Sequence, residues 1–309
     1  MGMSHDVMTA HSPHQRRVYK TNKMSLPSLL VNQMCLASWP QVLRKPITLS
    51  LIRRKSLQSL PFKTHLNGLV FEGDAANMID YHVLSRGAFE PGLTRLLIDW
   101  AKVHSQGIFL DVGANIGIHT LGALAHYPRI IAVEPYPLLA NRIRSSLAIN
   151  TISHVRLVEA ALAESEGSSF FNIPSYSNLG TGSIAAALGA SASQQNMEVR
   201  LLTGDGLMSV EERTLSAVKI DTEGAELRVL AGLAKTLQRD RPLVLTELLE
   251  DSASASSRMV ELFPDAYNFY RLDGIKKKRY NLSIWVSGHG DIVGIPSEKA
   301  HLLSKRIVG

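Results

Sequence analysis

The clearest structural signal in the chain is the stretch Ile108-Phe-Leu-Asp111-Val-Gly113-Ala-Asn115-Ile-Gly117. It begins with a short apolar run that ends in an acid, which is typical of a buried strand in a parallel sheet. Gly113 can take backbone angles that other residues avoid, and it can bring the main chain close to a ligand. The stretch therefore predicts a strand, a tight turn and a helix whose N-terminus faces a ligand crevice.

The residues of this turn restrict the ligand. A dinucleotide turn carries Gly-x-Gly-x-x-Gly so that the main chain can surround a pyrophosphate, but Asp111 occupies the first glycine position here. Its carboxylate would repel a pyrophosphate and would suit a cationic centre, such as the ammonium or sulfonium of S-adenosylmethionine. Glu134 ends the next expected strand, where an acid can accept hydrogen bonds from both ribose hydroxyls. The alternative is that Asp111 merely caps a helix.

Outward from the turn, strand and helix patterns alternate from about residue 65, which predicts an α/β fold with a parallel sheet. Strands are expected at 108–111, 129–134, 155–159, 215–221, 243–247, 267–272 and 281–286, the last two as an antiparallel pair. Helices are expected after Pro91 and over 117–125, 139–150 and 227–237. Residues 174–197 are rich in Ser, Gly, Ala and Asn and predict a long loop, either a lid or a flexible surface segment.

The charge of the chain is concentrated at its N-terminus. Residues 1–63 hold ten Lys or Arg and one acid, a net charge of +9, whereas residues 64–309 hold 23 basic and 26 acidic side chains, a net charge of −3. We therefore expect a basic, flexible N-terminal arm over 1–63 and a folded domain over 64–309. The arm could be a solvated leader, the result of a start codon assigned too early, a targeting peptide, or a peripheral contact with an anionic surface.

Composition also limits the class of protein. Cys35 is the single cysteine, so no disulfide forms within the chain and a zinc site built on thiolates is not expected. No stretch of 18 uncharged apolar residues exists, so no transmembrane segment is expected and a cytoplasmic location is predicted. Because the domain lacks a basic excess, a nucleic-acid partner is not expected.

Three segments together resemble the FkbM family of methyltransferases: Asp111 to Gly117, Ala132-Val-Glu-Pro135 and Lys219-Ile-Asp-Thr-Glu-Gly-Ala-Glu226. The resemblance runs from about residue 85 to 285. It implies a Rossmann-like class I fold, with a seven-stranded, mostly parallel sheet and helices on both faces. It also implies O-methylation of a hydroxyl on a sugar, glycolipid, polysaccharide or polyketide-like small molecule. The residues implied to bind S-adenosylmethionine are Asp111, Gly113, Asn115, Gly117, Glu134, Ala160 and Ala161.

The segment after the 215–221 strand supplies candidates for catalysis. An acceptor hydroxyl must lose its proton as the new bond forms, so a carboxylate near the methyl group is needed. Asp221 is our first choice for this base or for the positioning carboxylate, and Glu223 and Glu247 are second choices. In the alternative reading, Asp221 caps a helix and Lys219 only pairs with a neighbouring acid. Clustered carboxylates could also hold a divalent cation, but no complete ligand set is visible and no metal site is assigned.

Two other functions stay open at this point. A nicotinamide-dependent oxidoreductase would keep the acid at Glu134 but would need the glycine-rich pyrophosphate turn that is absent here. A catalytically inactive methyltransferase-like domain could serve in protein interaction or in recruitment to a membrane. The sequence identifies neither the acceptor molecule nor the oligomeric state.

Overall fold

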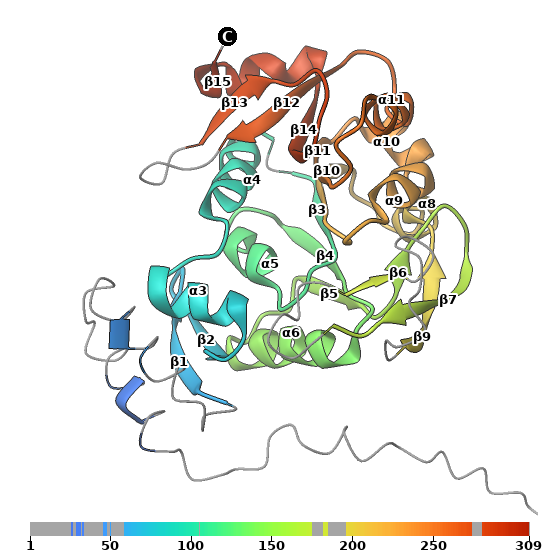
Figure 1. The fold of residues 1–309 in the computed structure, drawn as a ribbon. Coiled ribbons are helices and arrows are strands. Elements are labelled where there is room, and N and C mark those ends of the chain that lie inside the picture. The colour runs from blue at the N-terminus through green and yellow to red at the C-terminus, as the bar shows by residue number, and fades with distance from the viewer. Residues whose placement is uncertain are drawn as a thin grey trace, which may run out of the picture.

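The structure is a computed structural model that describes residues 59–104, 106–174, 182–184, 196–273 and 280–308, with a few residues between 26 and 50. A large twisted sheet runs through the centre of the molecule, with helices packed on both of its sides (Figure 1). Among the described residues, every helix is too short or too polar to cross a bilayer.

The central sheet has the strand order β5-β4-β3-β10-β11-β14-β12-β13-β15. The first five strands in this order are parallel, while β14 is antiparallel to both of its neighbours. The bounds are Ile108–Val112 (β3), Arg129–Val133 (β4), Val155–Val158 (β5), Leu215–Ile220 (β10), Leu243–Leu248 (β11), Tyr267–Asp273 (β12), Asn281–Ile284 (β13), Gly290–Pro296 (β14) and Ile307–Val308 (β15). The predicted α/β class with a mostly parallel sheet is confirmed.

The number of strands differs from the expected seven, because the described residues place nine strands in this sheet. The predicted antiparallel pairing of β12 with β13 is present. The unexpected β14 has the sequence Gly-Asp-Ile-Val-Gly-Ile-Pro, in which the strand-forming Ile and Val residues are interrupted by Gly, Asp and Pro. It forms a strand because β11 and β12 pair with it from both sides.

Helices cover the two faces of the sheet separately. One face carries α4 (Pro91–Val103), α5 (Ile118–Ala123), α6 (Pro137–Ile149) and the 3-10 helix η3 (Ser297–Arg306), and its core includes Leu96, Trp100 and Ile143. The other face carries α8 (Gly204–Met208), α9 (Glu226–Gly232), α10 (Ala234–Asp240) and α11 (Ala253–Glu261), packed around Leu230 and Leu237. These faces leave the carboxyl ends of the parallel strands available for a site.

An N-terminal hairpin, β1 (Pro61–Leu66) with β2 (Leu69–Asp74), packs against α6 together with α3 (Met78–Arg86). Asn150 accepts a hydrogen bond from the Val70 amide at 2.8 Å and donates one to the Val70 carbonyl at 2.9 Å. Arg142 pairs with the fully buried Asp80 at 2.9 Å. The predicted boundary at residue 63 falls within β1, most of residues 1–63 lie outside the described residues, and the division into arm and domain stays a prediction.

A small four-stranded sheet lies beside β5, in the order β6-β9-β7-β8. Its strands are Ala161–Leu162 (β6), Gly167–Asn172 (β7), Ser183–Ile184 (β8) and Asn196–Leu202 (β9). Within the predicted 174–197 loop, residues 183–184 form β8, and residues 196–197 are the first two of β9. The rest of that loop lies outside the described residues, and so does any lid formed by it.

Candidate functional site

The turn after β3 is held close to the end of β10. Gly113 has φ of 71°, and its amide donates to the Val133 carbonyl at 3.0 Å. A Cβ atom placed on Gly113 would lie 1.8 Å from the carbonyl oxygen of Asp221. Only glycine therefore fits at this position, for both backbone angle and space.

Glu134, just after β4, is hydrogen-bonded to the same turn. Its carboxylate accepts hydrogen bonds from the backbone amides of Asn115 and Tyr136, each at 2.8 Å. The residue is 4% exposed, and burial raises its pKa to about 7 although both amides oppose the rise. Each carboxylate oxygen can accept more than one hydrogen bond, so the group can still receive ligand hydroxyls.

A cavity of about 550 Å³ opens beside this turn, and we call it the turn cavity. Five of the seven predicted cofactor residues line it: Gly113, Asn115, Glu134, Ala160 and Ala161. Asp221 and Glu223 line it from the β10 side, and no basic side chain lines it among the described residues. The cavity therefore combines small and apolar walls with negative charge.

Asp111 and Gly117 do not line the turn cavity. Asp111 is fully buried, and its Oδ2 accepts a hydrogen bond from the Thr120 hydroxyl at 2.6 Å. Gly117 is the residue before α5, where a Cβ atom would lie 3.2 Å from Ile143 of α6. Both residues shape the turn from behind, and their assignment as cofactor contacts stays a prediction.

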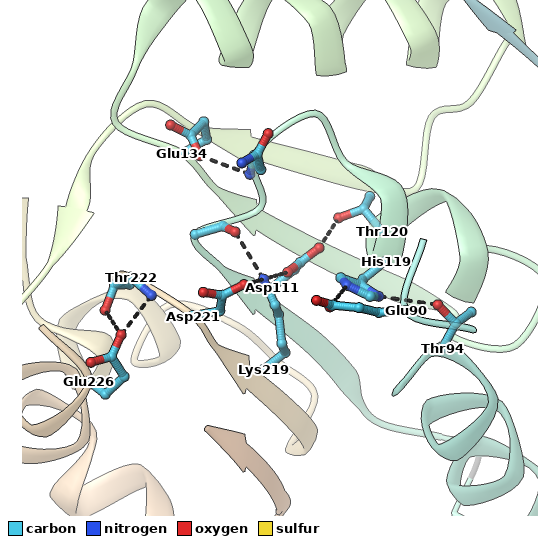
Figure 2. A network of polar contacts seen from close by, with 12 residues as sticks. Glu90, Thr94, Asp111, His119, Thr120, Glu134, Lys219, Asp221, Thr222 and Glu226 are labelled. Atoms are coloured by element: carbon cyan, nitrogen blue, oxygen red, sulfur yellow. Dashed lines mark hydrogen bonds and ion pairs between the residues drawn. The ribbon is translucent and has the colours of Figure 1, made fainter. Parts of the chain in front are cut away.

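Lys219 of β10 joins the two motifs (Figure 2). Its ammonium donates to the Gly113 carbonyl at 3.0 Å, and it lies 3.1 Å from Asp221 and 3.7 Å from Asp111. Burial opposes its charged form, but the carboxylates of Asp221, Asp111 and Glu90 together raise its pKa above the ordinary value. The predicted pairing of Lys219 with a neighbouring acid is confirmed, and Lys219 also joins the turn after β3 to Asp221.

A second cavity, of about 460 Å³, lies on the other side of Asp221, and we call it the acidic cavity. Its lining includes four carboxylates: Glu90, Asp221, Glu247 and Asp291. Burial raises the pKa of Glu247 to about 7, and the nearby charges of Asp221 and Asp291 add to the rise. Asp221 thus stands in the wall of both cavities, and its side chain is 35% exposed.

The three predicted catalytic residues are therefore divided between the cavities. Asp221 borders both, Glu223 lines the turn cavity, and Glu247 lines the acidic cavity. Burial, with the charges of Asp221 and Glu226, also raises the pKa of Glu223 to about 7. Among the described residues, no group of three or more His, Cys, Asp or Glu side chains is arranged to hold a metal ion.

Some residues that shape the site were not found from the sequence. Glu226 is buried and accepts hydrogen bonds from the amides of Thr222 and Gly224. Its spacing in the motif, two residues after a glycine, is the signal that could have shown this. Asp291 gave no signal, because it lies far from both motifs and reaches the site only through the pairing of β14 with β11.

Glu90 is held at the acidic cavity by α5. Its Oε2 lies 3.1 Å from Nε2 of His119, and Nδ1 of His119 lies 3.1 Å from the Thr94 hydroxyl. Burial opposes the ionisation of Glu90, but the hydrogen bond with His119 and the neighbouring positive charge together lower its pKa. The side chain therefore points a charged carboxylate into the cavity, and it does not line the turn cavity.

Comparison with known proteins bears directly on these motifs. A model of the methyltransferase FkbM domain matches residues 111–279, more than half of the chain. Methyltransferase sdnD of Sordaria araneosa is 27% identical over 192 residues, which cover 51% of this chain and 74% of that protein. Hexuronic acid methyltransferase AglP of Haloferax volcanii is 30% identical over 152 residues, which cover 48% of this chain and 58% of that protein.

Among solved structures, an FkbM methyltransferase from Methylobacillus flagellatus aligns with a TM-score of 0.41 and 13% identity, covering 70% of this chain and 52% of that one. The chain thus spans little more than half the length of this protein and of AglP. The family match begins at Asp111 and takes in the turn, Glu134 and the segment from Lys219 to Glu226. Since both cavities are built around these residues, the resemblance seen in the sequence is confirmed, and the chain belongs to the FkbM family of methyltransferases.

Proposed function

We propose that the chain transfers a methyl group from S-adenosylmethionine to a hydroxyl of a sugar, glycolipid, polysaccharide or polyketide-like small molecule. The observation that carries the proposal is the position of Asp221 in the wall shared by the turn cavity and the acidic cavity. Family membership supports methyl transfer, and the name of the relative AglP supports a sugar as acceptor. A cytoplasmic location remains part of the proposal.

The turn cavity fits this cofactor by the charge of its lining. The lining offers the carboxylates of Glu134, Asp221 and Glu223 without a basic side chain among the described residues, which favours a cationic ligand over a pyrophosphate. Glu134 would receive the ribose hydroxyls, and Ala160 and Ala161 would leave room for the adenine. The same charges argue against a nicotinamide cofactor.

The chain's own residues supply the base and the orientation. When bound, S-adenosylmethionine supplies a methyl group on a sulfur that is already a good leaving group. Asp221 would accept the proton of the acceptor hydroxyl while the hydroxyl oxygen bonds to the methyl carbon. Asp221 would later release that proton to solvent. Lys219, which contacts Asp221 at 3.1 Å, holds this carboxylate in place and does not change charge. Glu247, with a pKa of about 7, is the second candidate on the acceptor side.

Calorimetry tests the cofactor and a labelled-methyl assay tests the reaction. We expect S-adenosylmethionine and S-adenosylhomocysteine to bind, NAD⁺ not to bind, and Glu134→Ala to weaken binding by about tenfold or more. Asp221→Asn should lower transfer to an extract by about 100-fold, a much larger loss than its effect on cofactor binding, because it removes the base as well as one negative charge of the turn cavity. If the unaltered chain binds neither S-adenosylmethionine nor S-adenosylhomocysteine, the proposal is refuted. Binding without any transfer would indicate an inactive domain, and the same assay with EDTA shows whether a divalent cation is required.

A further inference from the structure

We propose that the acidic cavity selects methyl acceptors that carry no carboxylate or phosphate, and that Glu90 and Asp291 provide this selection. The inference rests on the proposed function, because it takes the acidic cavity as the place of the acceptor hydroxyl. It narrows the acceptor to a hydroxyl-rich molecule without negative charge. The relative AglP is named for a hexuronic acid, which is an anion at neutral pH, so the inference separates this chain from that relative.

Among the described residues, the side chains that line the acidic cavity leave no basic group free for an anion. Among the described residues that line the acidic cavity, Lys219 is the single basic one. Its ammonium already contacts the Gly113 carbonyl and Asp221, and it lies 3.7 Å from Asp111. An ammonium has three N–H donors, so these contacts leave little capacity for an acceptor carboxylate.

His119, the other basic group near this cavity, is also engaged. Both of its ring nitrogens have partners, Glu90 on one side and Thr94 on the other. It therefore fixes Glu90 rather than facing the cavity as a free cation. Sugar hydroxyls, in contrast, can donate hydrogen bonds to each of the carboxylates that line the cavity.

The carboxylates already repel one another before any acceptor enters. Partial loss of solvent raises the pKa of Asp291 to about 6, and the charges of Glu90 and Asp221 contribute to the rise. A further negative charge placed among them would meet the same repulsion, and like charges brought together reject a partner strongly. This argument holds whichever hydroxyl is methylated.

Glu90 and Asp291 are the residues best placed to discriminate without touching the reaction centre. Both line the acidic cavity and not the turn cavity, and they come from different elements, the segment before α4 and the β14 strand. Asp221, Lys219 and Glu247 belong to the proposed machinery, so changing them would mix selectivity with rate. Replacing Asp291 by asparagine changes charge and keeps size.

The first test uses a mixture of neutral, amine-bearing and uronate-bearing sugars from hydrolysed polysaccharides, incubated with the full chain and methyl-labelled S-adenosylmethionine. Labelled products are separated on an anion exchanger. We expect the label in the unretained fraction for the unaltered chain. In the variants Asp291→Asn and Glu90→Gln, the retained share should rise by about fivefold or more. The matched control is Asp265→Asn, an exposed acid next to the opposite end of β12, which should leave the distribution unchanged.

Label found mainly in the retained fraction of the unaltered chain would overturn the inference, and so would retained label that requires added Mg²⁺. The second test does not depend on turnover. Protein saturated with S-adenosylhomocysteine is heated with methyl glucoside or methyl glucuronide at equal concentration, and the glucoside should give the larger rise in Tm. An equal or larger rise with the glucuronide counts against the inference. Failure of S-adenosylhomocysteine to bind would instead refute the proposed function itself.

Discussion

At the scale of single residues, Gly113 and Asp221 are the closest point between the two motifs. The carbonyl oxygen of Asp221 occupies the space where a side chain on residue 113 would begin. Lys219 then joins both residues through the Gly113 carbonyl and the Asp221 carboxylate. A change at residue 113 therefore moves the turn after β3 and the proposed base together.

Gly113→Ala should lower the free energy of unfolding by about 3 kcal/mol or more, because the added Cβ meets backbone and the φ of 71° is strained for alanine. Urea denaturation measures the loss. Gly68→Ala is the matched control, since Gly68 has φ of 84° but no atom within 4 Å of an added Cβ. It should lose only the backbone cost of about 1–2 kcal/mol. Equal losses in the two variants would show that the contact with Asp221 does not matter.

At the scale of elements, the short loop between β10 and α9 is organised by its own helix. Glu226, the first residue of α9, accepts hydrogen bonds from the amides of Thr222 and Gly224 and from the Thr222 hydroxyl. Glu223, within this loop, has a positive φ of 57°. The loop that carries the proposed base thus depends on one buried carboxylate.

Glu226→Ala should free this loop without unfolding the sheet. Hydrogen exchange of the Thr222 and Gly224 amides should become at least about tenfold faster, because each loses its acceptor. Glu226→Gln keeps one acceptor oxygen and should give an intermediate rate. The exposed Glu212→Ala should leave both amides unchanged. Unchanged exchange in Glu226→Ala would mean that the loop is held by other contacts.

How far the sequence predicts the elements depends on whether their signal is local. The apolar runs of β3, β4, β10 and β11 lie where the sequence placed them, because a buried parallel strand shows its burial in its own composition. The edge strand β5, which is only partly buried, also lies at its predicted place. The short β6 and β8 and the glycine-containing β14 were missed, since they become strands only through partners distant in the chain. The other two strands of the small sheet, β7 and β9, were missed as well. The first residues of β9 lie within the predicted loop.

The site shows the same division. Gly113, Asn115 and Glu134, predicted from the sequence as cofactor residues, all line the turn cavity, and their role as cofactor contacts stays a prediction. The place of Asp111 behind the turn could not be read from the sequence, since it follows from the contacts of Thr120 and Lys219. Likewise, Asp291 reaches the acidic cavity only through sheet pairing.

At the scale of the whole molecule, stability should decrease as pH rises from about 4.5 to 7. Glu247 has an ordinary pKa of 4.5 and a folded pKa of about 7, so the folded protein binds a proton in this range that the unfolded chain has released. The free energy of unfolding therefore falls with rising pH across that window. Glu134 and Glu223, whose pKa values are also raised to about 7, act in the same direction.

Urea denaturation of the protein without ligand, measured between pH 4.5 and 8, tests this slope. Glu247→Gln should reduce the decrease by on the order of 1 kcal/mol, because glutamine does not titrate. Asp265→Asn is the control and should keep the slope of the unaltered chain. A slope that Glu247→Gln leaves unchanged, or one of opposite sign, would contradict the raised pKa of Glu247.

The contacts between the hairpin and α6 affect how the chain is made. Val70 and Asn150 lie 80 residues apart, and Asp80 and Arg142 lie 62 apart. Translation adds about 5–20 residues per second, so the hairpin leaves the ribosome roughly 4–16 s before its partners are complete. During that interval its apolar side, with Phe62 and Phe71, has no helix to cover it. We therefore expect the nascent chain to expose these apolar side chains until α6 emerges.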